Sequence, residues 1–257
     1  MKENPEELLN LAGEIGRQLL INGAEIYRVE DSLEHILQAY GCEQIEVFAI
    51  PACIIINIVE NGVNHSKTVR IKGSGNNMFR LGALNDLSRK ICREIPSIQT
   101  AQAELEEILQ SPLYPDIISF IGYGAGAAFF TLFWGGKSLD AIIAFCGGLI
   151  IKPTLSYMKE VKANIFFTNL LASMLSAIFP VLLQSIGVPM HLDKIIIGDI
   201  MLLVPGIAMT NVFRDVLSGD FVTAVSKLAE VLIVSLAIAV GIILPISATK
   251  LILTAIG

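Results

Sequence analysis

The second half of the chain consists largely of long apolar segments, and they constrain the fold more than any other feature of the sequence. Residues 117–136 form a run of twenty uncharged residues, and residues 163–190 form another uncharged run. An α-helix needs about 20 apolar residues to cross the roughly 30 Å hydrocarbon core of a bilayer. The mean hydropathy of the whole chain, +0.65, is also too high for an ordinary soluble domain. The sequence therefore predicts a multi-span α-helical membrane protein.

Residues 116–257 are expected to form a transmembrane domain. Five spans are expected, at about residues 117–136, 138–158, 163–187, 195–213 and 221–245. Lys152-Pro153 interrupts the second candidate, which is therefore either broken or complete, and we favour a complete span. Pro205-Gly206 breaks the fourth candidate. A break inside a membrane leaves backbone groups that only neighbouring helices, water or a ligand can satisfy.

Residues 1–111 are less apolar and are expected to form a small α/β domain. Helices are expected at about residues 5–21, 24–40, 78–94 and 100–109. Residues 44–70 are rich in β-branched side chains, and Asn61-Gly62 is a two-residue turn that favours a hairpin. Pro51 separates the first apolar run of this stretch from the second, so they are separate strands or one bulged edge strand.

Several functional classes find no support in the residue patterns. The net charge of -6 and the absence of a basic tract argue against a nucleic-acid partner. The four cysteines are scattered without a CxxC pair, which argues against a zinc site or a disulfide framework. The loop KGSGNN lacks the ending of a phosphate loop, and no nucleophile lies in a spacing that implies activation. We therefore expect no cofactor, no metal and no enzymatic activity.

The acidic, amphipathic N-terminus predicts no cleavable signal peptide.

The distribution of basic residues predicts the orientation in the membrane. On one side lie the basic residues of 1–111 together with Lys152, Lys159, Lys162, Arg214 and Lys227. On the other side lie only Lys137, Lys194 and Lys250. An excess of Lys and Arg stays cytoplasmic. The N-terminal domain is therefore expected inside and the C-terminus outside.

Ionisable and helix-breaking residues in the membrane domain form the candidate site. A charge within a bilayer costs a few kcal/mol or more, so such groups usually face a bundle interior or a water-filled path. The candidate substrate- or ion-binding residues are Asp140, Asp199, Pro205, Gly206, Thr210, Asn211, Arg214, Asp215, Asp220, Lys227 and Glu230. Asp199, Gly206 and Thr210 would share nearly one face of a continuous helix. Glu230 lies about nine residues past the start of the fifth span, roughly 13 Å deep, and is the expected buried carboxylate.

Some of these residues also have purely structural explanations. Glu230 could form an interfacial ion pair with Lys227, and Arg214 with Asp215 could be a stop signal that fixes topology. Asp140 could merely cap the helix that begins near Ser138. In the N-terminal domain, Glu25 and Arg28 are three residues apart, a spacing typical of an exposed, ion-paired helix face.

Three separated stretches of the sequence resemble a known family. GAEIYRVEDSLEHI, LVPGIAMTNVFRDVLSGD and SKLAEVLIVSLAIAVG resemble, in this order, the N-terminal domain of the threonine/serine exporter family. The resemblance covers nearly the whole chain and implies a secondary exporter of small polar metabolites in a bacterial cytoplasmic membrane. Family members of full length join such a domain to a second, smaller multi-span domain, and split members act as two-subunit pairs, some associated with succinate. The chain stops at Gly257, so a smaller multi-span membrane subunit is the expected partner.

The leading hypothesis is thus one subunit of a proton-motive-force-driven exporter of an amino acid or a dicarboxylate across the lipid bilayer. Glu230 would exchange a proton, and Arg214 or the helix ends freed at Pro205-Gly206 would meet the substrate carboxylate. Asp199 or Asp215 would meet an α-amino group. Two other classes remain open, an accessory membrane subunit and a membrane-tethered hydrolase.

Overall fold

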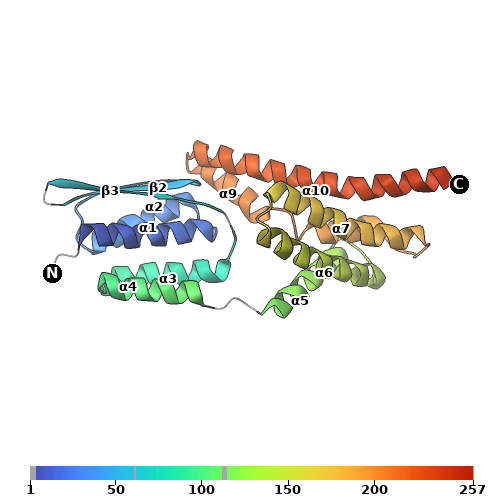
Figure 1. Cartoon of the computed structure of the whole chain (residues 1–257), viewed down its shortest axis with the longest axis horizontal. Helices are drawn as coiled ribbons and strands as arrows, with labels where there is room; N and C mark the ends of the chain where they lie inside the picture. Colours follow the sequence, from blue (N-terminus) through green and yellow to red (C-terminus); the bar gives the residue numbers. More distant parts are fainter. Residues whose placement is uncertain (1–3, 61, 74, 112–114, 257) are drawn as a thin grey trace. The chain divides into compact units, whose positions relative to one another are not determined.

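The computed structural model describes residues 4–60, 62–73, 75–111 and 115–256 (Figure 1). The chain divides into two compact units. One contains residues 1–112 with 211–226, and the other contains residues 113–210 with 227–257. The N-terminal part is mixed α/β and the rest of the described chain is helical, which confirms the predicted fold class.

The N-terminal part of the first unit has three layers. Its elements are α1 (Pro5–Ile21), α2 (Ile26–Ala39), β1 (Gln44–Ile50), β2 (Cys53–Glu60), β3 (Val63–Arg70), α3 (Met78–Glu94) and α4 (Ile98–Gln110). The sheet contacts α1 and α2, and these two helices contact α3 and α4 on their other side (Figure 1). Apolar side chains at helical spacing in α1 and α2 meet alternate side chains of β2. Ile15, Leu33 and Ile54 are completely buried where these layers meet.

The three strands form an antiparallel sheet in the order β1-β2-β3. Ile50 pairs with Cys53, so Pro51 lies in the short connection between two separate strands. Glu60 pairs with Val63, as a two-residue hairpin turn requires. Gly62 has φ 77°, a left-handed conformation that glycine adopts without a steric cost. Asn61, the other residue of the predicted turn, lies outside the described residues.

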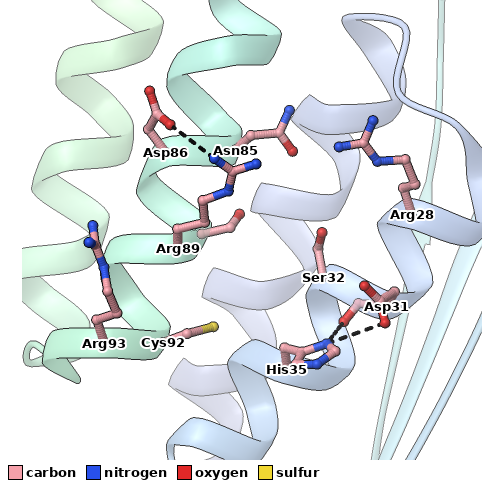
Figure 2. A pocket seen from close by; sticks show the side chains of 10 residues that line it. Arg28, Asp31, Ser32, His35, Asn85, Asp86, Arg89, Cys92 and Arg93 are labelled. Carbon is pink, nitrogen blue, oxygen red and sulfur yellow. Dashed lines mark hydrogen bonds and ion pairs between the residues drawn. The ribbon is translucent and has the colours of Figure 1, made fainter.

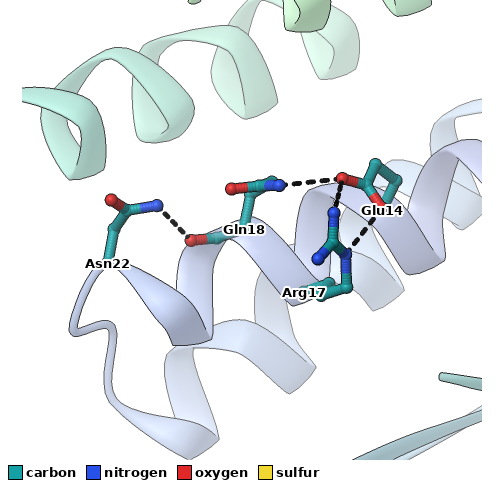
Figure 3. Close-up of polar contacts among 4 residues, drawn as sticks. All are labelled: Glu14, Arg17, Gln18 and Asn22. Atoms are coloured by element: carbon teal, nitrogen blue, oxygen red, sulfur yellow. Dashed lines mark hydrogen bonds and ion pairs between the residues drawn. The ribbon is translucent and has the colours of Figure 1, made fainter. Parts of the chain in front are cut away.

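Polar side chains fix both ends of α1, and Figure 3 shows those of its second half. The Asn4 side chain accepts a hydrogen bond from the Glu6 amide, and Pro5 occupies the first turn, where a missing N–H costs nothing. At the other end, Asn22 Nδ2 donates to the Gln18 carbonyl over 2.7 Å. Between them, Arg17 Nε donates to Glu14 Oε2 over 2.8 Å, and Gln18 Nε2 donates to Glu14 Oε1 over 2.8 Å. These contacts explain why the helix runs from Pro5 to Ile21.

The membrane part contains α5 (Asp116–Phe133), α6 (Ser138–Glu160), α7 (Ile165–Ser185), α8 (Leu192–Ile200), α9 (Gly206–Leu217) and α10 (Phe221–Ile256). Within the described residues, four helices are long and apolar enough to cross a membrane, namely α5, α6, α7 and Phe221–Leu251 of α10. Residues 195–213, for which the fourth of the five spans is expected, fold as parts of two shorter helices, α8 and α9. The predicted break at Pro205-Gly206 separates these two helices.

Helix α6 runs without interruption through Lys152-Pro153, as favoured for this segment. Proline has no amide hydrogen, so Pro153 removes one hydrogen bond from the helix. Thr154 Oγ1 donates to the Ile150 carbonyl over 2.8 Å, and Lys152 Nζ donates to Ser156 Oγ over 3.3 Å. Two polar side-chain contacts therefore lie next to Pro153 within the continuous helix.

Small residues allow α5 and α6 to approach closely. A Cβ added at Gly148 would overlap the backbone of Tyr123 and Gly124. Gly122 and Gly126 form a GxxxG pair on α5. A Cβ at Gly126 would lie 2.9 Å from Leu202 Cδ2, whereas one at Gly122 would meet nothing within 4 Å among the described residues. The closest backbone approach is thus shifted from the GxxxG pair to Gly148.

Candidate functional site

Asp199 is a deeply buried carboxylate in the last turn of α8. Its exposed fraction is 2%, and neither carboxylate oxygen has a hydrogen-bond partner among the described residues. The carboxylate lies directly against Gly147 of α6, where an added Cβ would overlap it. A buried ionised carboxylate without a partner is costly. This position therefore requires a proton or a positively charged group on Asp199.

Glycines on two helices create the space in which Asp199 lies. Gly198 packs so closely on α5 that an added Cβ would overlap Thr131 Oγ1 and lie 2.7 Å from the Ala127 carbonyl oxygen. The buried Thr131 hydroxyl already donates to that carbonyl over 2.9 Å. Gly198 on one side of α8 and Gly147 opposite Asp199 let α8 pack closely against both α5 and α6. Asp199 is consequently held by backbone packing and not by polar neighbours.

The chain leaves the helix immediately after Asp199 and Ile200. Residues 201–204 form turns, in which the amides of Leu203 and Val204 donate to the Ile200 carbonyl over 2.8 and 3.0 Å. Pro205 has no amide to donate, and α9 begins at Gly206. The first amides of a new helix have no partner within it. Asp199 therefore does not share a helix face with Gly206 and Thr210, because the expected continuous helix is broken between them.

Asp140 caps α6 and also joins it to the start of α8. Its Oδ2 accepts a hydrogen bond from the Lys137 amide over 2.7 Å, and its Oδ1 accepts one from the His191 amide over 2.9 Å. His191 Nδ1 lies 2.9 Å from Oδ2 as well. The carboxylate is buried and its oxygens are occupied, so the structure favours the capping explanation for Asp140 over a binding role.

Arg214 forms an ion pair with Glu25, the residue that precedes α2. The Glu25 side chain is only 11% exposed, and its Oε2 has no hydrogen-bond partner among the described residues. Sequence reasoning instead placed Glu25 with Arg28 on an exposed helix face. Both Glu25 and Arg214 belong to stretches that carry the family resemblance. That both residues lie in these stretches is the sequence signal that could have suggested the ion pair.

Other acidic residues lie near the ends of α9 and α10 in the same unit. Asp215 is buried, and Asp220 Oδ1 accepts a hydrogen bond from the Thr223 amide over 3.1 Å, which caps α10. Glu30 Oε1 accepts a hydrogen bond from the Ala49 amide over 2.7 Å. Burial raises the pKa of Glu30; the Ala49 hydrogen bond opposes this, and the negative charge of Asp220 adds to it.

The remaining candidate residues are more accessible. Thr210 is exposed, and its Oγ1 donates to the Gly206 carbonyl over 3.0 Å. Asn211 and Lys227 are half-buried, whereas Glu230 is exposed. The buried carboxylate expected at Glu230 is instead found at Asp199. Depth along a helix does not bury a side chain unless a neighbouring helix covers that side.

In this helical membrane protein, a buried carboxylate without a hydrogen-bond partner among the described residues lies beside a helix break. Discontinuous helices are where many secondary transporters bind substrate. The family model ThrE, described as "Putative threonine/serine exporter", matches residues 10–248, and the chain belongs to this family.

The names of two bacterial relatives agree with this membership. The chain is 24% identical to "Threonine/serine exporter" of Corynebacterium glutamicum, over 95% of this chain and 52% of the relative. It is 19% identical to "Probable threonine/serine exporter" of Mycobacterium tuberculosis, over 93% and 45%. It is 22% identical to "Pheromone-regulated membrane protein 10" of Kluyveromyces lactis, over 89% and 24%. The chain thus spans about half the length of the two bacterial relatives. No solved structure matches it.

Proposed function

We propose that the chain is a subunit of a secondary active exporter that moves small polar metabolites across the cytoplasmic membrane. The observation that carries this proposal is Asp199, a buried carboxylate at the end of a broken helix that has no hydrogen-bond partner in the described part of the chain. The family points to transport and not to catalysis.

Asp199 can couple export to proton entry through competition for one carboxylate. When the site faces one side, the carboxylate binds the ammonium group of a substrate, and when it faces the other side, it binds a proton. Either cation removes the cost of an isolated buried charge. The first amides of α9, which follow the break at Pro205, can meet the substrate carboxylate, since a helix N-terminus favours an anion. Asp215 is a second candidate for the substrate ammonium, while Arg214 must first leave Glu25 to bind substrate.

An amino acid such as threonine or serine is the substrate class we propose. It carries both charges that the site can meet, and the names of two bacterial relatives refer to these amino acids. A dicarboxylate such as succinate has no ammonium group for Asp199. It would require a second cation near Arg214, for which Lys227 is the candidate.

We also propose that a smaller multi-span membrane protein completes the exporter, because the chain covers about half of each bacterial relative. The same observation favours a second candidate function, in which this chain is an accessory subunit. Reconstitution of each subunit alone and of both together separates the two. Full-rate transport by the partner alone would identify this chain as accessory.

The central test is export from cells loaded with threonine, serine or succinate. Asp199→Asn should lower the export rate more than about tenfold, which corresponds to about 1.4 kcal/mol. Asp193→Asn on the same helix is the matched control, because the Asp193 side chain is 66% exposed. Export by Asp199→Asn at the wild-type rate, with normal membrane abundance, would exclude the proposed role of Asp199.

A further inference from the structure

Four helices of the N-terminal part meet at one of its ends, which we call the junction end (Figure 1). The Asn77 amide, just before α3, donates to the carbonyl of Asn22, just after α1, over 3.2 Å. Arg80 Nη2, in the first turn of α3, donates to the Leu109 carbonyl in the last turn of α4 over 2.7 Å. The junction end therefore contains the end of α1, the start of α3 and the end of α4. The short connection from α1 to α2 adds the start of α2.

Helices α2 and α3 run away from the junction end in the same direction. Both helices line one groove, in which Figure 2 shows Arg28 level with Asn85 and, further along, His35 level with Cys92. The Cα–Cβ bonds of an α-helix tilt toward its N-terminus. Side chains in the first turns of α2 and α3 therefore lean over the junction end.

Three large side chains occupy these first turns. Tyr27 in α2 is 44% exposed, and Met78 and Phe79 in α3 are 50% and 58% exposed. Apolar residues that are scattered singly over a surface are common, but exposed apolar side chains that gather in one place indicate a contact surface. The junction end is thus a candidate contact surface of the N-terminal part.

Two connections limit the distance from the junction end to the membrane-spanning helices. Residues 111–115 separate α4 from α5, the first candidate span. An extended chain covers at most about 3.6 Å per residue, so this connection reaches no further than about 22 Å in any conformation. At the start of α2, Glu25 pairs with Arg214, which is four residues from Thr210, the last residue before the chain leaves the other unit. Four residues of α9 span only about 6 Å.

We propose that the junction end rests on the bilayer surface, with Tyr27, Met78 and Phe79 in the headgroup region. The bilayer surrounds the candidate spans, and both connections keep the junction end within reach of it. Aromatic and other large apolar side chains favour this region, because they leave water there while their polar neighbours stay hydrated. This contact depends on the candidate spans and not on the proposed transport function.

The test places a tryptophan at the junction end of the full-length chain in phosphatidylcholine vesicles. Trp134→Phe first removes the only tryptophan of the chain, and Phe79→Trp then adds the probe. Bromine on the lipid acyl chains near the headgroup quenches an indole that lies close to it. We expect the probe to lose at least about half of its fluorescence relative to unbrominated vesicles, since indole rings favour the interface.

Ile95→Trp in the same Trp134→Phe background is the matched control. Ile95 directly follows α3 and is 53% exposed, close to the 58% of Phe79. It lies at the opposite end of the helix, roughly 24 Å from Phe79 at about 1.5 Å per residue. Bromine should therefore leave the fluorescence of the Ile95→Trp variant unchanged.

Quenching of the Phe79→Trp variant alone would support the proposal. Equal responses of the Phe79→Trp and Ile95→Trp variants, whether both or neither are quenched, would overturn it, as would quenching of the Ile95→Trp variant alone. Thermal unfolding shows whether each variant is folded. Met78→Trp is the second probe of the junction end, and it decides in the same way if the Phe79→Trp variant does not fold.

Discussion

At the scale of single residues, the position of Asp199 depends on the absence of a side chain at Gly147. A side chain at Gly147 would occupy the space of the Asp199 carboxylate. We expect Gly147→Ala to displace the carboxylate, to cost about 1–3 kcal/mol by overpacking and to lower export. Thermal unfolding in detergent and the export assay measure the two effects.

Gly122→Ala on α5 is the control for this substitution, because no described atom lies within 4 Å of the added Cβ. Equal effects of the two substitutions would mean that the contact with Asp199 has no special importance.

The ion pair between Glu25 and Arg214 also allows a residue-level prediction. Hydrogen bonds to charged groups are stronger than neutral ones, but the Arg214 side chain is 47% exposed and solvent weakens the pair. We expect Glu25→Gln and Arg214→Gln each to lower stability by about 1 kcal/mol. The double variant should lose less than the sum of the two, as measured by thermal unfolding in a double-mutant cycle. Strict additivity would show that the two side chains do not interact.

At the scale of elements, the polar contacts along α1 predict a pH dependence of stability (Figure 3). Burial raises the pKa of Glu14, but hydrogen bonds from Arg17 and Gln18 and the charge of Arg17 together lower it below the ordinary value of 4.5. A carboxyl whose pKa is lower in the folded state stabilises the fold above its unfolded pKa. That contribution is lost as pH falls through the folded pKa.

We therefore expect Glu14→Gln to lower the free energy of unfolding at pH 7 by no more than about 1 kcal/mol, because the pair is partly exposed. The difference from wild type should shrink as pH falls below 4.5 and vanish at an acidic pH below the folded-state pKa. Thermal unfolding midpoints at the two pH values test this, with the exposed Glu46→Gln as control. A difference that grows as pH falls would have the wrong sign.

Secondary structure was largely predictable from local patterns. Apolar periodicity predicted α1 to α4, and the run lengths predicted α5 to α7. The Asn61-Gly62 signal predicted the β2–β3 connection, and Pro205-Gly206 predicted the break between α8 and α9. These features depend on residues close together in the sequence, so a single sequence contains their signals.

The candidate site was less predictable because it depends on contacts between distant segments. Asp199 is buried by glycines in α6 and α8, and Glu230 is exposed despite its depth along α10. Glu25 pairs with a residue almost two hundred positions away, and i to i+3 spacing within α2 could not indicate it. Periodicity reports which face of a helix is apolar, but not which partner covers a polar group.

At the scale of the whole molecule, the predicted orientation can be tested with a reporter that is active only outside the cytoplasm. Alkaline phosphatase has this property because it needs an oxidising compartment. Fused after residue 257, it should be active, whereas after residue 162, between α6 and α7, it should be inactive, because Lys159 and Lys162 favour the cytoplasmic side. Reversed activities would place the N-terminal domain outside.

The division of the chain into units has a practical consequence for dissecting the protein. Residues 211–226 belong to the same compact unit as residues 1–112, and they supply the arginine that pairs with Glu25. A protease nick between residues 112 and 113 would therefore leave the two fragments associated until a denaturant is added. A recombinant piece ending at residue 111 would lack part of its own unit, so its failure to fold would say little about the intact chain.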